Sequence, residues 1–111
     1  MSCIFCRIAK KEIPSSIVYE DDKVLAFNDI SPQAPTHILV IPKEHVASLA
    51  EIKDHSVLSD IFSVINKIAA EKGISKTGFR TVINNGKAAG QAVDHLHVHL
   101  LGGRDFGWPP W

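Results

Sequence analysis

Histidine occupies every second position from residue 95 to residue 99, and the positions between are aliphatic. Successive side chains of a β-strand point to opposite faces of a sheet, so this alternation predicts a strand with two chemically different faces. The aliphatic face can pack on a core. The other face gathers side chains that exchange protons near neutral pH, which indicates catalysis or metal ligation, although three hydrogen-bonded, half-buried histidines would give the same pattern. The histidine face consists of His95, His97 and His99, and the aliphatic face of Leu96, Val98 and Leu100.

The size and charge of the chain narrow the possible classes. Its 111 residues suffice for a single domain with one core, which we expect to span residues 1–111. Twelve basic and twelve acidic residues cancel, so no basic surface favours nucleic acid. The longest apolar runs, such as residues 38–41, are too short to cross a membrane, and the N-terminus does not resemble a signal peptide. We therefore expect a cytoplasmic protein.

The remaining pattern predicts an α+β fold. Apolar residues recur at helical spacing over residues 55–72, with Asp54 placed to cap the start of this long helix and Gly73 to end it. Four further segments favour strands, which with the histidine strand make a five-stranded, mostly antiparallel sheet. The expected strands are 17–20, 24–28, 36–41 and 79–84; a short N-terminal helix is expected over 3–11 and a turn over 85–91.

Four segments together carry a more specific signal. They are NDISPQAPTH (28–37), IPK (41–43), GQ (90–91) and HLHVHLLGGR (95–104). This combination resembles the histidine triad (HIT) nucleotide-binding proteins, and the Trp-Pro-Pro run near the C-terminus is similar to the Hint branch. The resemblance covers nearly the whole chain. It implies a HIT-like fold and a hydrolase of purine nucleoside 5′-phosphoramidates, which splits AMP or GMP from an amine, AMP-lysine included.

The resemblance also implies roles for four catalytic histidines. The middle one, His97, would attack phosphorus and form a nucleotidyl-imidazole that water then hydrolyses, which splits one difficult step into two easier ones. Attack needs a neutral imidazole, so its other nitrogen should donate to an acceptor, which in the family is a backbone carbonyl within the histidine strand. His99 would contact the phosphate and the bridging atom, and His37 would orient the triad from behind. His95 completes the triad.

The same resemblance implies a nucleotide pocket. A carboxylate at position 29 would accept from the ribose hydroxyls, two apolar residues would hold the base, and the turn after residue 89 would bring backbone N–H groups to the phosphate. Turn capping, core packing and plain turn chemistry are the structural alternatives. The chain has alanine at position 92, where better-known eukaryotic members have serine, so we expect a weaker phosphate contact with retained chemistry. The pocket residues are Phe27, Asn28, Asp29, Ile30, Asn84, Gly90, Gln91, Ala92 and His99.

A zinc site is a separate expectation. Two cysteines at Cys-x-x-Cys spacing in a reducing compartment read as metal ligands or a redox pair before a structural disulfide. Structural zinc takes four ligands, and the resemblance implies that His45 and His95 join Cys3 and Cys6, as in some bacterial relatives. The alternative is two free thiols, an exposed His45 and a His95 that serves only the triad. His55 is expected at the surface.

We also expect a homodimer. The C-terminal segment 106–111 is aromatic, whereas free termini are normally polar and frayed, so it should dock on a surface. In the family two sheets join into one, and the tail lies near the partner's pocket; Trp108 and Trp111 would then contact the leaving group, or else pack on their own subunit. Two other functions stay open: a dinucleoside polyphosphate hydrolase, and a nucleotide-binding regulatory module with incidental hydrolysis.

Overall fold

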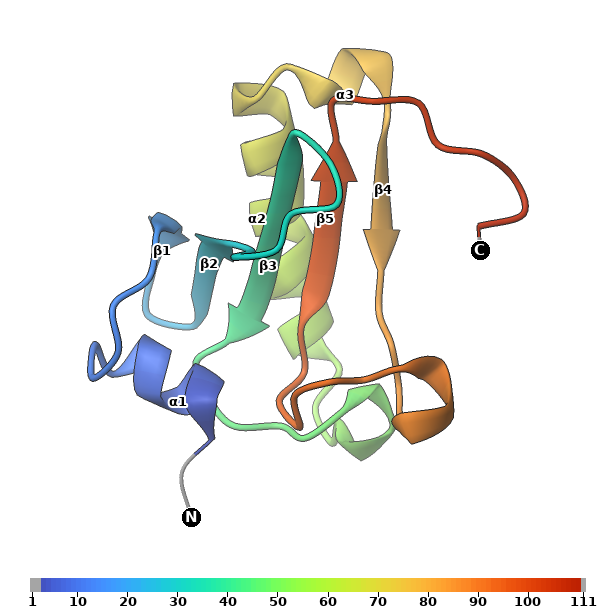
Figure 1. Cartoon of the computed structure of the whole chain (residues 1–111). Helices are drawn as coiled ribbons and strands as arrows, with labels where there is room; N and C mark the ends of the chain where they lie inside the picture. Colours follow the sequence, from blue (N-terminus) through green and yellow to red (C-terminus); the bar gives the residue numbers. More distant parts are fainter. Residues whose placement is uncertain (1–2, 111) are drawn as a thin grey trace.

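The computed structural model describes residues 3–110, which form a five-stranded antiparallel sheet with helices packed on it (Figure 1). The strand order is β1-β2-β3-β5-β4, so the expected α+β class and the five-stranded sheet are confirmed. The strands are β1 (Ile17–Glu20), β2 (Val24–Asn28), β3 (Thr36–Pro42), β4 (Phe79–Val82) and β5 (Val98–Gly102). The helices are α1 (Ile4–Ala9), α2 (Ser56–Glu71) and α3 (Ile74–Thr77), with single 3₁₀ turns η1 (Leu49–Glu51) and η2 (Lys87–Ala89).

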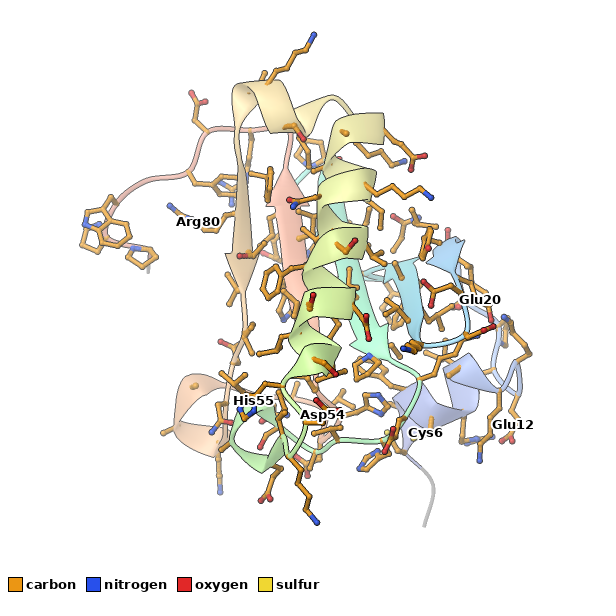
Figure 2. The ribbon with its side chains drawn as sticks, turned by 180° about the vertical axis from the view of Figure 1, so that it is seen from behind. Cys6, Glu12, Glu20, Asp54, His55 and Arg80 are labelled. Carbon is orange, nitrogen blue, oxygen red and sulfur yellow. The ribbon has the colours of Figure 1, made fainter. Side chains whose placement is uncertain are left out.

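The long helix α2 covers one face of the sheet, and it lies in front of the strands in the rear view (Figure 2). Its apolar side chains recur at helical spacing and are buried against alternate residues of the central strands. Asp54 accepts the Ser56 N–H with its side chain at the start of the helix, and Gly73 takes a left-handed conformation (φ 76°) just after its end. The larger core cluster includes Ile61, Ile65, Ile68, Ala26, Val40, Val98 and Leu100.

The opposite face carries a second, smaller core under the short helix α1. Phe5 and Ile8 of α1 pack on residues of β2 and β3 that alternate with those facing α2. This packing holds the N-terminal segment beside the end of β3 (Figure 1). The ring of Phe5 also meets the rings of His95 and His97 edge-on, with centroids 6.0 and 5.2 Å away. The histidine face of the sheet is therefore the face that α1 partly covers.

The histidine strand is shorter than its sequence pattern predicts. Strand β5 begins at Val98, so His95 and His97 precede it. The neighbouring strand ends at Pro42, which has no N–H to continue the ladder. The polar groups of residues 95–97 form other hydrogen bonds instead. Leu96 N donates to the Val46 carbonyl at 2.6 Å, and the rings of His95 and His97 each donate to a backbone carbonyl. The two faces still separate as predicted, because Leu96, Val98 and Leu100 all lie in the core against α2.

Other differences from the prediction are local. Strand β4 ends at Val82 instead of residue 84, α1 occupies only part of 3–11, and α3 and both 3₁₀ turns were not predicted. Each unpredicted element is four residues or fewer, which is too short for a period to be visible. None of the helices within residues 3–110 is long and apolar enough to span a bilayer.

The C-terminal tail leaves the sheet beyond the edge strand β4 (Figure 1). Two arginines lie over the ring of Phe106, with the guanidinium carbons of Arg104 and Arg80 4.3 and 5.1 Å from its centroid. Arg80 also donates to the Gly107 carbonyl at 2.8 Å, and it lies beside the tail in Figure 2. Trp108 remains 83% exposed, so it does not pack on its own subunit; Trp111 lies outside the described residues.

Candidate active site and metal centre

His97 is buried, and its tautomer follows from a single hydrogen bond. Its Nδ1 lies 2.7 Å from the carbonyl oxygen of His95. A carbonyl can only accept, so a neutral His97 carries its proton on Nδ1 and keeps the lone pair on Nε2. A lone pair on the ring nitrogen away from the backbone is what a nucleophilic histidine requires. The predicted acceptor for this ring, a backbone carbonyl of the triad segment, is the one found.

His99 and His37 form a second pair beside it. His37 Nε2 lies 2.9 Å from His99 Nδ1, and the rings of His97 and His99 lie with centroids 5.1 Å apart. His37 sits on β3 and His99 on β5, so the pairing of these strands brings the two rings together. Burial, followed by repulsion from positive charge on His97 and His37, lowers the pKa of His99 to about 4. His99 is therefore neutral near pH 7.

The residues predicted to hold the nucleoside lie at the end of β2. Asp29 accepts the Ser31 N–H on Oδ1 at 2.7 Å, and its Oδ2 lies 3.5 Å from His37 Nε2. The turn-capping alternative for Asp29 is thus present, with one oxygen left toward the histidines. Phe27 is buried in the core under α1, whereas Ile30 is 98% exposed. Asn28 donates from its side chain to Ser16 Oγ at 2.9 Å.

The turn before the triad is fixed by its own hydrogen bonds. The backbone N–H groups of Gly90 and Gln91 donate to the carbonyls of Lys87 and Gly86. The Gln91 side chain donates to the Ala47 and Val93 carbonyls and accepts from Gly86 N. In this conformation the two amides are thus paired within the turn, and their contact with a phosphate stays a prediction. The contacts predicted for Ala92 and Asn84 also stay predictions; Asn84 is half-buried.

A cluster of four ligating side chains lies at the other end of the triad. The cluster joins α1, the loop after β3 and the triad segment. Measured from His95 Nδ1, Cys3 Sγ lies at 3.3 Å, Cys6 Sγ at 3.5 Å and His45 Nδ1 at 3.2 Å; Cys6 Sγ and His45 Nδ1 are 3.3 Å apart. A tetrahedral zinc ion with its usual bond lengths needs ligand atoms roughly 3.3–3.8 Å apart. The cluster has the donor set and the spacing to bind zinc.

The protonation of His95 also suits a metal ligand. Its Nε2 lies 2.7 Å from the Pro42 carbonyl oxygen and must donate to it, which leaves the Nδ1 lone pair directed at the cluster. Burial lowers the pKa of His95, so the ring stays neutral. Burial, followed by the hydrogen bond with Cys3, raises the pKa of the Cys6 thiol, so zinc binding must displace a proton there.

A second group of possible ligands, Asp29, His37 and His99, fits a metal less well. The Gln33 N–H donates to His37 Nδ1 at 3.0 Å, so the proton of a neutral His37 resides on Nε2, the nitrogen that would have to face the ion. This protonation favours the cluster of Cys3, Cys6, His45 and His95 as the metal site over the group of Asp29, His37 and His99.

These features match a known family. The HIT domain model matches residues 10–106. The chain belongs to the HIT domain family. A crystal structure of a HIT family hydrolase from Legionella pneumophila superposes with a TM-score of 0.96 at 47% identity, and the match covers 99% of this chain and 100% of that one.

Two other relatives of this HIT protein bear on its sites. A 14 kDa zinc-binding protein of Zea mays is 51% identical over 111 residues, which cover 96% of this chain and 86% of the maize protein. A histidine triad nucleotide-binding protein from Candida albicans superposes with a TM-score of 0.85 at 41% identity, with 97% of this chain and 83% of that chain covered.

Three contacts at the sites of this HIT domain could not be found from sequence patterns. They are the Pro42 carbonyl that fixes His95, the Gln33 N–H that fixes His37, and the Arg104 side chain that donates to the Gln33 carbonyl. Two of them are backbone groups, which every residue carries and no motif marks. The Gly-Gly-Arg segment was part of the family resemblance, but its role was not predicted.

Proposed function

We propose that this chain is a nucleotide-binding hydrolase that cleaves purine nucleoside 5′-phosphoramidates, AMP-lysine among them, through a nucleotide covalently attached to His97. The observation that carries the proposal is the 2.7 Å hydrogen bond from His97 Nδ1–H to the His95 carbonyl, which leaves the Nε2 lone pair for attack. Membership of a family that includes HIT hydrolases, and the likeness to a histidine triad nucleotide-binding protein, support it.

The chemistry follows from the two ring tautomers. His97 Nε2 attacks phosphorus, a new P–N bond forms, and the bond from phosphorus to the substrate amine breaks. The departing amine takes its proton from solvent, because a neutral His99 that gave up its Nε2 proton would become an imidazolate. His99 Nε2–H instead donates a hydrogen bond to the leaving nitrogen, while His99 Nδ1 accepts from His37. Water then attacks phosphorus, its proton passes to solvent, and the bond to His97 breaks, which returns His97 to the neutral form with its proton on Nδ1. The imidazolium formed at His97 is stabilised by the His95 carbonyl.

The nucleoside would lie beside β2. Asp29 Oδ2 is the carboxylate oxygen left for the ribose hydroxyls, because Oδ1 accepts from Ser31. The exposed side chain of Ile30 offers apolar surface to a purine base. Phe27 would support that surface from within the core.

We propose a structural role for zinc at Cys3, Cys6, His45 and His95. The ligand spacing and the zinc-binding maize relative support it. His95 would hold the ion through Nδ1, while its backbone carbonyl accepts from His97, so the ion would have a structural role apart from the reaction steps. The ion would join α1 to the segment that carries the nucleophile.

We further propose a cytoplasmic homodimer of the Hint type. Strand β4 is an edge of the sheet, and an edge presents unpaired backbone groups that another strand can bond. The tail with its exposed Trp108 leaves the sheet on the β4 side (Figure 1). Pairing of two β4 edges would cover the unpaired backbone groups and the exposed Trp108. A specific interface should bury more than about 1,000 Å² in total.

The test compares two substrates. Adenosine 5′-phosphoramidate should be hydrolysed to AMP and ammonia, and diadenosine triphosphate should be hydrolysed at least about a hundredfold more slowly, as expected when one site is built for one leaving group. Faster hydrolysis of the dinucleotide would assign the chain to that other activity. Tight AMP binding with neither substrate hydrolysed would leave a nucleotide-binding module and overturn the proposal.

A further inference from the structure

Arg104 lies outside the triad but contacts the loop that supports it. Its Nε–H donates to the Gln33 carbonyl at 3.0 Å, and its Nη1 donates to the Asp105 carbonyl at 2.9 Å. The guanidinium packs over the Phe106 ring, which fixes the side chain from the far side. Arg104 is exposed, and these three contacts hold its guanidinium against the loop and the tail.

Gly103, the residue before Arg104, packs closely against the loop 31–35. Gly103 has a left-handed φ of 89°, and a Cβ at this position would lie 2.9 Å from Pro35 Cβ. The backbone of the Gly-Arg pair therefore lies directly against the loop 31–35. Gln33 is also tied within the loop, since its side-chain amide donates to the Ser31 carbonyl at 3.0 Å. Gln33 is thus held by Arg104 at its backbone carbonyl and by Ser31 at its side-chain amide.

The backbone N–H of Gln33 connects this loop to the histidines of the site. Gln33 N–H donates to His37 Nδ1 at 3.0 Å. A backbone N–H only donates, so Nδ1 must hold a lone pair and the proton of neutral His37 lies on Nε2. His37 Nε2–H then donates to His99 Nδ1 at 2.9 Å. His99 accepts on Nδ1 and carries its own proton on Nε2, for which no partner is found within residues 3–110.

We propose that Arg104 is a positioning residue for His99: by holding Gln33, it fixes the tautomer of His37 and so keeps the His99 proton on the nitrogen next to the reacting group. The importance of that proton for turnover rests on the proposed function. The tautomers themselves do not, because they exist without substrate. Loss of the Arg104 contact would let Gln33 move and allow His37 to carry its proton on either nitrogen.

The first experiment uses the unmodified protein. Nitrogen-15 NMR of the histidine rings should show His37 and His99 both protonated on Nε2, with couplings across the two N–H···N hydrogen bonds that join Gln33, His37 and His99. A His37 or His99 protonated mainly on Nδ1 in the parent would overturn the proposal before any variant is made.

The second experiment compares R104Q and R104K with R80Q. Arg80 contacts the same Phe106 ring and the same tail, but its side-chain hydrogen bond goes to Gly107 and not to the loop 31–35, so R80Q is a matched control. R104Q should give mixed tautomers at His37 and His99, whereas R80Q should keep those of the parent. R104K, with a donor but no planar fork, should fall between them.

Kinetics then separates positioning from binding. For adenosine 5′-phosphoramidate, R104Q should lower kcat about tenfold, the effect of losing one hydrogen bond to a charged donor, with KM changed less than about twofold. Unchanged tautomers in a folded R104Q would refute the proposal, as would a kcat equal to that of the parent despite mixed tautomers. If the parent hydrolyses no phosphoramidate, the proposed function fails while the tautomer result still decides the role of Arg104.

Discussion

His99 is neutral because the protein surrounds it with apolar atoms and other imidazoles. Its pKa falls to about 4, mainly through burial, against an ordinary value near 6.5. We predict that ring NMR of the folded protein shows His99 titrating below pH 5. A titration midpoint above pH 6 would contradict the account. A charged His99 carries a proton on both ring nitrogens, so its Nδ1 could not accept a hydrogen bond from His37 Nε2–H.

The lowered pKa of His99 also links stability to pH. Between the folded and unfolded pKa values the unfolded chain binds more protons, so stability rises with pH across this window. The contribution is complete above about pH 6.5 and is lost as the pH falls toward 4. We expect a H99Q variant to show a shallower loss of the free energy of unfolding over pH 6.5–4 than the parent. The free energy of unfolding is measured by urea titration at each pH. An equal dependence on pH in H99Q and the parent would disprove this linkage.

At the scale of single elements, we predict that α1 is stabilised by zinc bound at Cys3, Cys6, His45 and His95. It has six residues and buries only Phe5 and Ile8, and helices so short are marginal by themselves. Protein purified without chelator should contain about one zinc per chain, as four protein ligands close one site. H45A should lose most of this zinc, measured by elemental analysis. H55A, which removes an exposed histidine outside the cluster, should keep it; equal zinc in both variants would exclude His45 as a ligand.

The contact between β5 and α3 gives a second prediction for elements. A Cβ at Gly102 would lie 2.7 Å from Ile74 Cδ1 and 3.1 Å from Ile74 Cβ, so more than a flexible end must move. We expect G102A to lower the free energy of unfolding by about 1–3 kcal/mol, the usual cost of overpacking. G107A meets nothing within 4 Å and should be nearly neutral. Chemical denaturation of both variants checks this, and equal stabilities would contradict the close packing.

For the molecule as a whole, the homodimer can be tested directly. Sedimentation at micromolar concentration should give twice the chain mass of 12.2 kDa. Truncation after Gly107 should alter the preference among amine leaving groups more than nucleotide affinity, if the tail reaches the partner's pocket. A fully active monomer would contradict both the dimer and the shared site.

Much of the architecture could be predicted because the spacing of apolar residues along the chain determines it. The alternation over residues 95–100 and the helical spacing of α2 placed the histidine segment and the long helix, and separated the histidine face from the core. The extent of β5 could not be predicted, since it depends on where Pro42 ends the neighbouring ladder. The use of the Gly90 and Gln91 amides within their own turn depends on loop conformation, which no sequence pattern encodes.

The site divides in the same way. The triad histidines and the Cys-x-x-Cys pair could be identified from their spacing, whereas His37 and His45 were identified only through the family resemblance. The groups that set their protonation could not, because they are the backbone atoms of His95, Pro42 and Gln33. Such atoms meet their partners only after the loops around the sheet have closed.

The central claim is that His97 becomes covalently attached to the nucleotide, and a rapid-quench experiment tests it most directly. Adenosine 5′-phosphoramidate is mixed with the protein, quenched within a turnover, and the intact mass and peptides are measured. We predict an AMP adduct located on His97, absent in H97A, whose turnover should fall by at least about a hundredfold. Turnover by H97A within tenfold of the parent, or hydrolysis by the parent with no trappable adduct, would contradict the account.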